Sequence, residues 1–208
     1  MDVNVKMTAN TKKIEEKRQR ILECSLILFT EKGYLNTTVR EIIDNSGFGT
    51  STFYRHFSKK EDVLKTLLSD FLDQIIDRVN DYFAREKSLY SRYIETKHII
   101  IDAFAQNSQL AEIYSRVAGI SESIDSCIKE FDDKFLSFTS KNIEFGIKKG
   151  LFRELKVSPI AHATLGLIKY AVYKWVVLKE VTLEEMVDMV MSFHESLAIG
   201  LVENKDIQ

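Results

Sequence analysis

The sequence predicts an all-α protein made of two parts, a small amino-terminal domain and a larger helical bundle. The 208 residues include one proline and eight glycines, too few for the many tight turns of a β-rich chain. Apolar residues recur at spacings of three and four along most of the chain, which is the period of amphipathic helices. Hydrophobic residues make up 45% of the chain, enough for a sizeable core. We expect the first domain over residues 1–58, with the start of a connecting helix to about residue 66, and the second over 59–208.

Charge is distributed unevenly along the chain. Residues 1–66 contain 12 lysines and arginines against 9 acidic residues, whereas the remainder contains 17 against 22. The formal net charge of -2 hides this asymmetry. A basic amino-terminal part suits contact with nucleic acid confined to that part.

Cysteine usage and targeting signals indicate a cytoplasmic protein. Cys24 and Cys127 are too few and too far apart to suggest a disulfide framework or a metal site, so we expect two buried free thiols. The first 20 residues are polar and lysine-rich, without the apolar segment of a signal peptide. No apolar run approaches the ~18 residues of a membrane span. We therefore expect no membrane partner.

The first helix is expected over residues 11–32, with Gly33 as its stop. A basic cluster lies at its start, where positive charge opposes the helix dipole. Two interpretations remain open for it, a solvated helix face and a phosphate-binding surface beside a duplex. The cluster consists of Lys12, Lys13, Lys17, Arg18 and Arg20.

Residues 37–60 predict two short helices joined by a tight turn. Thr37 or Thr38 can cap the first of them, and Glu41 follows Thr38 at the spacing of a capping box. A glycine-rich turn over 47–49 then breaks the apolar pattern. In the next helix Phe53 and Phe57 are four apart and face inward, while the residues between them are polar. This is the pattern of a helix-turn-helix whose second helix offers hydrogen bonds outward to the major groove.

The rest of the chain predicts six more helices. Ser58, followed by Glu61, can cap a long helix that runs to about Ala84 and connects the two domains. Ser158 and Pro159 form a typical helix start. The helices after the connecting one are expected over residues 89–106, 109–117, 121–149, 159–179 and 183–202.

The last two predicted helices are apolar on more than one side. A helix on the surface of a monomer needs only one apolar stripe. The pair is therefore either fully buried core or a dimer interface, and we favour the dimer because a two-fold axis would pair two DNA-binding domains. The expected interface residues are Leu167, Ala171, Trp175, Val190, Phe193 and Leu197.

A set of residues between positions 12 and 66 has the spacing and residue types of a known DNA-binding domain. These residues are Ile21-Leu22, Leu28-Phe29, Gly33-Tyr34, Thr37–Ile42, Gly47, Thr52–Phe57 and Lys60–Leu64. Residues 12–66 thus resemble the DNA-binding domain of the TetR family of transcriptional regulators, although Ile43, Ser46, Gly49 and Ser51 depart from the usual pattern of the family. The resemblance implies a homodimeric repressor on a pseudo-palindromic operator, with an effector in the second domain that changes the spacing of the DNA-binding domains.

The resemblance also implies which residues contact DNA. Arg40 is chemically suited to guanine, because a guanidinium can fork onto the O6 and N7 atoms of that base. Tyr54 has a half-buried core position as its alternative, and His56 a plain surface position. The implied DNA-binding residues are Thr38, Arg40, Thr50, Ser51, Thr52, Tyr54, His56 and Lys60.

An effector pocket is expected in the second domain, which holds 16 of the 22 aromatic residues. Pockets are mostly apolar with a few polar groups, so the same aromatic stripe also fits ordinary core packing. A hydrophobic or aromatic small molecule is the expected effector. The candidate pocket residues are His98, Phe104, Tyr114, Phe131, Phe135, Phe138, Asn142, His162 and Tyr170.

Two other classes of function are weighed against a regulator. The four histidines fall on four different predicted helices, and the sequence lacks a zinc-protease motif, a glycine-rich phosphate loop and a nucleophile elbow. We therefore expect no catalysis, no cofactor and no metal. The other alternative is a helical ligand-binding or protein-interaction scaffold that does not bind DNA. Steep loss of DNA affinity with salt would separate a regulator from such a scaffold.

Overall fold

The computed structural model of the chain describes residues 9–201, with side chains described over residues 11–196. Within these limits the chain forms nine α-helices and one π-helical turn, which confirms the predicted all-α class. Two compact units divide between Leu67 and Leu68, inside helix α4 (Lys60–Arg85). We call them the amino-terminal unit and the carboxy-terminal unit. No helix in the described part of the chain has the length and apolar character needed to cross a bilayer.

The amino-terminal unit consists of α1 (Ala9–Lys32), α2 (Val39–Ser46), α3 (Thr50–His56) and the first turns of α4. The helices α1, α2 and α3 pack on one another in all three pairs. Buried apolar side chains come from all these helices and from the residue that ends α3. They include Ile21, Leu22, Phe29, Ile42, Phe53, Phe57, Val63 and Leu64.

Capping groups set the ends of α2. The Thr38 hydroxyl accepts a hydrogen bond from the Glu41 N–H (3.2 Å), and the Glu41 carboxylate accepts one from the Thr38 N–H (2.8 Å). Gly47 ends the helix with a φ of 75°, a left-handed conformation that suits glycine. The buried Ser46 hydroxyl donates to the Ile43 carbonyl (2.8 Å) and accepts from the Phe48 N–H (3.3 Å). The serine at this position is therefore satisfied within the turn.

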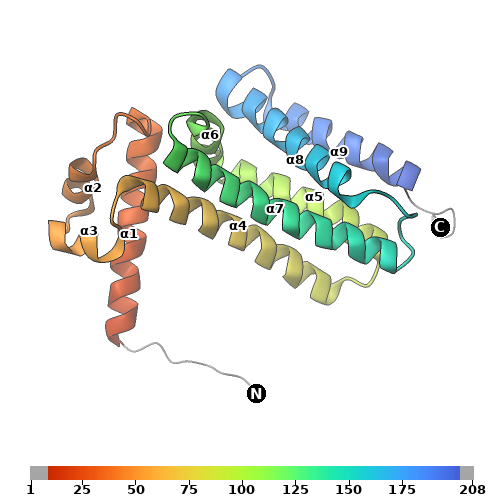
Figure 1. Cartoon of the computed structure of the whole chain (residues 1–208), viewed down its shortest axis with the longest axis horizontal. Helices are drawn as coiled ribbons and strands as arrows, with labels where there is room; N and C mark the ends of the chain where they lie inside the picture. The colour runs from red at the N-terminus through yellow and green to blue at the C-terminus, as the bar shows by residue number, and fades with distance from the viewer. Residues whose placement is uncertain (1–8, 202–208) are drawn as a thin grey trace. The chain divides into compact units, whose positions relative to one another are not determined.

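The carboxy-terminal unit contains the remainder of α4 and five further α-helices. Figure 1 shows α4, α5 and α7 as long helices running along one another, with α8 and α9 as an antiparallel pair. Within the unit α8 packs on α7 and α6, and α9 packs on α5. The helices are α5 (Leu89–Gln106), α6 (Ser108–Val117), α7 (Glu122–Lys148), α8 (Val157–Tyr173) and α9 (Leu183–Leu201).

The apolar residues that recur at steps of four and three along α7, here called its apolar seam, are buried over the first turns of the helix and exposed near its end. Ile124, Ile128, Phe131 and Phe135 are buried, but further on Phe145 is 39% exposed. Steps of four and three average 3.5 residues, whereas the α-helix has 3.6 per turn, so the seam rotates by ~20° per heptad. Over its last turns α7 therefore buries the neighbouring face instead, with residues Thr139, Ile143 and Gly146.

The start and end of α8 differ from the prediction. The helix begins at Val157 with Lys156 as its cap, so Ser158 and Pro159 lie inside the first turn. The N–H groups of a first turn have no partner within the helix, so a proline there costs no hydrogen bond. The α-helix ends at Tyr173 and continues as the π-helical turn η1 (Lys174–Leu178). Lys179 then reverses the chain with a φ of 56°. A non-glycine residue in this conformation leaves no glycine signal in the sequence.

Candidate functional site

Helix α3 presents a polar side away from its packed aromatic residues. Phe53 is 1% exposed, and its ring centroid lies 5.9 Å from that of Phe57. With these rings fixed, Thr50, Ser51 and Arg55 are exposed. Tyr54 is 55% exposed, which excludes the half-buried core position weighed above.

The outward polar groups of α3 have no hydrogen-bond partners among the described residues. Gly49 caps the helix without a side-chain hydrogen bond. The hydroxyls of Thr50, Ser51 and Tyr54 make no hydrogen bond to other described residues. Arg55, which sequence reasoning did not select, extends this surface, because it lies four residues after Ser51 and so on the same side of the helix. That spacing was the available signal.

His56 is half-buried at the end of α3. Burial lowers the pKa of its imidazole, and the nearby positive charges of Arg55 and Arg18 lower it further. The ring is therefore neutral at pH 7, and it can offer a phosphate an N–H donor but not a full charge.

At the start of α2, Arg40 and Thr38 differ in how free they are. The Arg40 side chain is 91% exposed, and its Nε atom lies 3.9 Å from the Asp44 carboxylate. The Thr38 hydroxyl also donates to the Glu41 carboxylate (2.9 Å), so both its donor and an acceptor position are used in the capping box. Hydrogen bonds from Lys32 and from Thr38 lower the pKa of Glu41 to about 2. Thr38 therefore supports α2, whereas Arg40 is available to an external partner.

Lys60 is used inside the amino-terminal unit. Its ammonium donates to the carbonyls of Tyr34 (2.6 Å) and Thr37 (2.7 Å) and lies 4.3 Å from the centroid of the Tyr34 ring. Burial lowers its pKa. Two of its three N–H donors thus join the start of α4 to the link between α1 and α2, which leaves one for a phosphate.

The basic cluster of α1 is partly neutralised by acids on the same helix. Arg18 pairs with Glu15 at 3.0 Å, and Arg20 pairs with Glu23 at 3.8 Å. Lys17 lies over the ring of Phe48, 5.9 Å from its centroid. Three of the five cations in the cluster therefore have partners inside the unit, whereas Lys12 and Lys13 are exposed.

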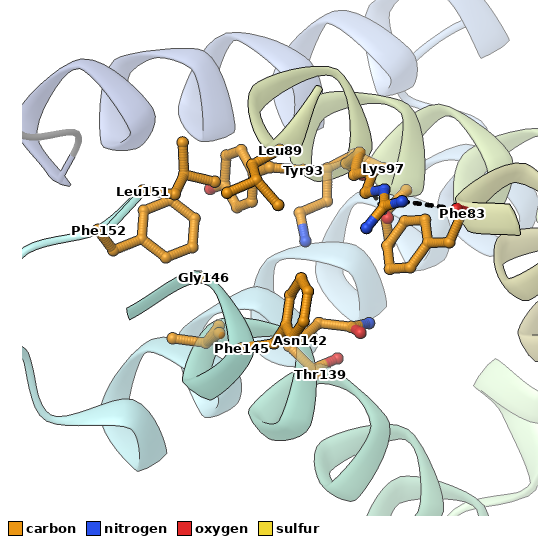
Figure 2. A pocket seen from close by; sticks show the side chains of 13 residues that line it. Phe83, Leu89, Tyr93, Lys97, Thr139, Asn142, Phe145, Gly146, Leu151 and Phe152 are labelled. Carbon is orange, nitrogen blue, oxygen red and sulfur yellow. Dashed lines mark hydrogen bonds between the residues drawn. The ribbon is translucent and has the colours of Figure 1, made fainter. Parts of the chain in front are cut away.

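A cavity lies within the carboxy-terminal unit, between α5, α7 and the end of α4. Figure 2 shows the Lys97 side chain reaching from α5 toward Asn142 and Phe145 on α7, with Phe152 at one end and Phe83 at the other. The cavity has a volume of about 30 Å³, which is room for about two waters, and it is partly open to solvent. It is lined by Phe83, Leu89, Arg92, Tyr93, Thr96, Lys97, Thr139, Asn142, Ile143, Phe145, Gly146, Leu151 and Phe152.

Two neighbours fix the walls of this cavity. The Arg92 guanidinium donates to the carbonyls of Phe83 and Glu86, both at 2.7 Å, and so satisfies the end of α4. A Cβ atom on Gly146 would lie 2.6 Å from the Phe152 ring, so only glycine lets that ring pack against α7.

His194 of α9 is held neutral beside the cavity wall, its ring centroid 6.4 Å from that of Tyr93. A carbonyl can only accept, so the contact with Val190 O (2.8 Å) places the proton on Nδ1, and Nε2 accepts from the Thr164 hydroxyl (3.4 Å). Burial and the nearby Lys97 charge lower the pKa of His194 to about 4.

Of the predicted pocket residues, only Asn142 lines the cavity. The aromatic residues of α5, α6 and α7 are core: the Phe71 ring packs 5.0 Å from Phe104 and 6.3 Å from Phe131, and Tyr114 packs 4.8 Å from Phe131. The Tyr114 hydroxyl donates to Asp132, which also pairs with Lys169. Phe135 is buried, Phe138 and His98 are half-buried away from the cavity lining, and His162 and Tyr170 are exposed. None of these eight residues lines this cavity, so their place in an effector pocket stays a prediction.

The structure buries some of the predicted dimer residues within the protomer and leaves others partly exposed. Ala171 and Val190 are 0% exposed within the protomer, so they pack between α8, α9 and their neighbours, and their assignment to an interface is corrected. Leu167 and Trp175 are half-buried, and Phe193 is 39% exposed. The Leu197 side chain lies outside the described residues. The exposed side of α8 instead carries Ala163, Gly166, Tyr170 and Tyr173.

Cys24 and Cys127 are both buried, and neither forms a disulfide within the described residues. Over the described side chains, no three His, Cys, Asp or Glu residues gather in a way that could hold a metal ion.

Comparison with known proteins decides the family. A protein from Syntrophomonas wolfei, assigned to the TetR family of transcriptional regulators, has a crystal structure that matches this one with a TM-score of 0.87 and 56% identity. The match covers 92% of this chain and 99% of that chain. The chain belongs to the TetR family of transcriptional regulators. The family model for bacterial regulatory proteins of the tetR family matches residues 21–67, so the resemblance drawn from the amino-terminal residues is confirmed.

Two further relatives of this TetR-family chain are more distant. The transcriptional repressor KstR2 of Rhodococcus jostii is 27% identical over 141 residues, which is 66% of this chain and 68% of that protein. The transcriptional regulator FadR of Bacillus subtilis, in complex with stearoyl-CoA, shares the fold with a TM-score of 0.76 at 22% identity, over 88% of this chain and 98% of that chain. As a TetR-family protein the chain is a DNA-binding, ligand-responsive regulator, and its partners are operator DNA, a small-molecule effector and a second copy of itself.

Proposed function

We propose that the chain is a repressor that binds a pseudo-palindromic operator as a homodimer, with α3 of each copy in the major groove. The observation that carries this proposal is the outward side of α3. Its hydroxyls and the Arg55 guanidinium have the hydrogen-bonding chemistry that base edges require, and they have no hydrogen-bond partners of their own among the described residues. Two such helices on a two-fold dimer read half-sites about 34–36 Å apart, or a modestly larger spacing. Repression is inferred because relatives such as KstR2 carry the name of repressors.

The residues around α3 divide into readers and supports. Arg40 is exposed and takes a phosphate or a guanine, and Tyr54 and the neutral His56 contact the DNA backbone. Thr52 is half-buried and lies at the edge of this surface. Thr38 and Lys60, with their hydrogen bonds inside the unit, act by holding α2 and α4 in place.

The dimer interface is assigned to the exposed side of α8 together with Phe193 of α9. Ala163 and Gly166 let a partner helix approach closely, and Tyr170 and Tyr173 supply apolar area. A Cβ atom at Gly166 would meet nothing within 4 Å in the protomer. Gly166→Arg should therefore leave the fold intact and separate the dimer, measured by sedimentation. A dimer that survives this change would contradict the interface.

The effector site is assigned to the cavity at the end of α4. This helix belongs to both units, so a ligand that contacts Phe83 and Arg92 acts on the one helix that continues into the DNA-binding unit. A ligand can change DNA binding only if its affinity differs between the arrangement of the dimer that binds the operator and the arrangement that does not. FadR in complex with stearoyl-CoA supports an effector with a long apolar part in this fold. We further infer that the protein works in the cytoplasm and carries out no catalysis of its own.

Selection of bound duplexes from random DNA tests the proposal. The purified chain should enrich a sequence with two related half-sites. Its affinity should fall steeply with salt, since phosphate contacts release counterions with a slope of about −0.9 per contact in a double-logarithmic plot. Enrichment of no sequence, or affinity that ignores salt, would favour a helical scaffold that does not bind DNA.

A further inference from the structure

Lys97 of α5 is a buried ammonium without a counter-ion. It is 5% exposed, and it makes no hydrogen bond or ion pair to any described residue. Its ammonium lies 4.9 Å from the centroid of the Tyr93 ring, and its charge also acts on the neutral His194. No acidic residue is among those that line the cavity. An unpaired buried charge is strongly unfavourable, so the fold carries a cost here that no interaction within the described chain offsets.

Two further residues that line this cavity have polar groups without hydrogen-bond partners in the described structure. The Nδ2 atom of Asn142 and the hydroxyl of Tyr93 are buried and lack hydrogen-bond partners in the described structure. Both can donate, as can the ammonium of Lys97. Buried polar groups are normally satisfied, so three unsatisfied donors at one cavity indicate a missing acceptor.

The remaining lining of the cavity is apolar. Phe83, Leu89 and Ile143 contribute to it, together with Leu151 and Phe152. Phe145 is 39% exposed, which places it where the cavity lining reaches solvent. Such walls exclude a highly charged ligand and favour one whose bulk is hydrocarbon.

We propose that this cavity binds the carboxylate of a small apolar acid, with Lys97 as its counter-ion and Asn142 as a second hydrogen-bond donor. The proposal rests on the proposed function and gives its effector a chemical class. The hydrocarbon part of the acid lies against Phe83, Phe145 and Phe152. The pKa of Lys97 is lowered by burial to about 8, so about nine-tenths of the side chains are still charged at pH 7 and attract an anion. A cationic ligand would face two cations, Arg92 and Lys97, and a neutral one would leave the ammonium unpaired.

The binding site also explains how the acid can act on α4. Phe83 belongs to α4, and Arg92 holds the last carbonyls of that helix. An acid that packs on Phe83 therefore contacts the end of the helix that is shared by both units. The cavity is too small for a hydrocarbon chain as it stands, so lining side chains must move when the acid enters, and a movement of Phe83 would act on α4.

A matched set of eight-carbon probes tests the inference on the full chain by calorimetry and thermal unfolding. Octanoate should bind, and its affinity should exceed that of the neutral isostere octanamide by at least about tenfold, the effect of one charged hydrogen bond. A nine-carbon aromatic acid, 3-phenylpropanoate, is added to this set to show whether the hydrocarbon part is aliphatic or aromatic. Octylamine and inorganic phosphate should not bind. Equal affinity for octanoate and octanamide, or preference for octylamine or phosphate, would overturn the proposal.

Variants at two lysines separate ligand binding from fold. Lys97→Met should abolish octanoate binding and should raise the melting temperature of the ligand-free chain by several degrees, because it removes the unpaired charge. Lys141→Met, at an exposed lysine one residue from Asn142, should change neither. A Lys97→Met chain that binds octanoate as well as the wild type would overturn the proposal. Should that variant fail to fold, the octanoate-to-octanamide ratio of the wild type still decides.

Separate measurements of operator binding and acid binding distinguish failure of the effector class from failure of the proposed function. A wild-type chain that binds its selected duplex but no acid would refute the effector class and leave the regulator intact. A chain that binds octanoate through Lys97 but no duplex would refute the proposed function and leave the acid site intact.

Discussion

The amino-terminal unit and the cavity of the carboxy-terminal unit use lysine side chains in opposite ways. In the amino-terminal unit the Lys60 ammonium donates to two carbonyls, and the Thr38 hydroxyl is engaged with Glu41 on both sides. In the cavity of the carboxy-terminal unit, Lys97 and Asn142 have donors that meet no acceptor. Lys60 and Thr38 hold the fold, whereas we assign the donors of Lys97 and Asn142 to a ligand. The same residue type, lysine, therefore has a structural role in one unit and a binding role in the other.

The largest expected effect concerns His194, a satisfied group of the carboxy-terminal unit. Its pKa is about 4 in the folded chain against an ordinary 6.5, so the unfolded chain binds a proton first. The stability that neutral His194 contributes is complete above pH 6.5 and is lost as the pH falls toward 4. The loss should amount to about 3 kcal/mol, measured by urea unfolding of the wild type against His194→Gln. His162→Gln, at an exposed position of α8, should keep the pH dependence of the wild type.

Removal of Lys60 tests the structural role directly. Lys60→Ala leaves the carbonyls of Tyr34 and Thr37 without their donor, and it should destabilise the amino-terminal unit by about 2 kcal/mol. Hydrogen exchange of amides in α1 and α2 reports this loss. Lys13→Ala, at an exposed position of α1, is the control. If Lys60→Ala weakened DNA binding while amide protection stayed unchanged, Lys60 would be a phosphate contact and not a support.

Loss of the cap at α2 should have a smaller effect. Thr38→Ala removes a side-chain oxygen that accepts from the Glu41 N–H, and N-cap changes of this kind cost about 1 kcal/mol. Thr38→Ser keeps the oxygen and should behave as the wild type in chemical unfolding. A serine variant as unstable as the alanine variant would mean that the methyl group, not the cap, is what matters.

The smallest effect on stability is expected at Arg40. Its side chain is 91% exposed, so Arg40→Ala should change the unfolding free energy by less than about 0.5 kcal/mol. It should nevertheless relax the preference for one base in the selected operator, with a cost of about 1–3 kcal/mol at that position. Competition between matched and mismatched duplexes measures this. An unchanged preference would make Arg40 a phosphate contact.

Local signals made the amino-terminal unit predictable. The capping box of Thr38 and Glu41 sets the start of α2, and the left-handed Gly47 sets its end. The buried rings of Phe53 and Phe57 orient α3. The cavity was harder, because its polar group is a lysine in an amphipathic helix, where a solvated position is the usual outcome. Lys97 does lie four and seven residues before the buried Ile101 and Phe104, and that shared face was the signal for its burial. The drift of the α7 seam similarly follows from its spacing, but which neighbours it then meets depends on contacts remote in sequence.

DNA binding through the outward side of α3 is the central claim, and one measurement tests it most directly. Fluorescence anisotropy compares the wild type with the double variant Ser51→Ala/Arg55→Ala on the duplex selected by the wild type. Both positions are exposed, so the variant should unfold at the wild-type temperature and yet lose at least about tenfold in affinity for that duplex. Unchanged affinity in a folded double variant would show that DNA is bound elsewhere or not at all.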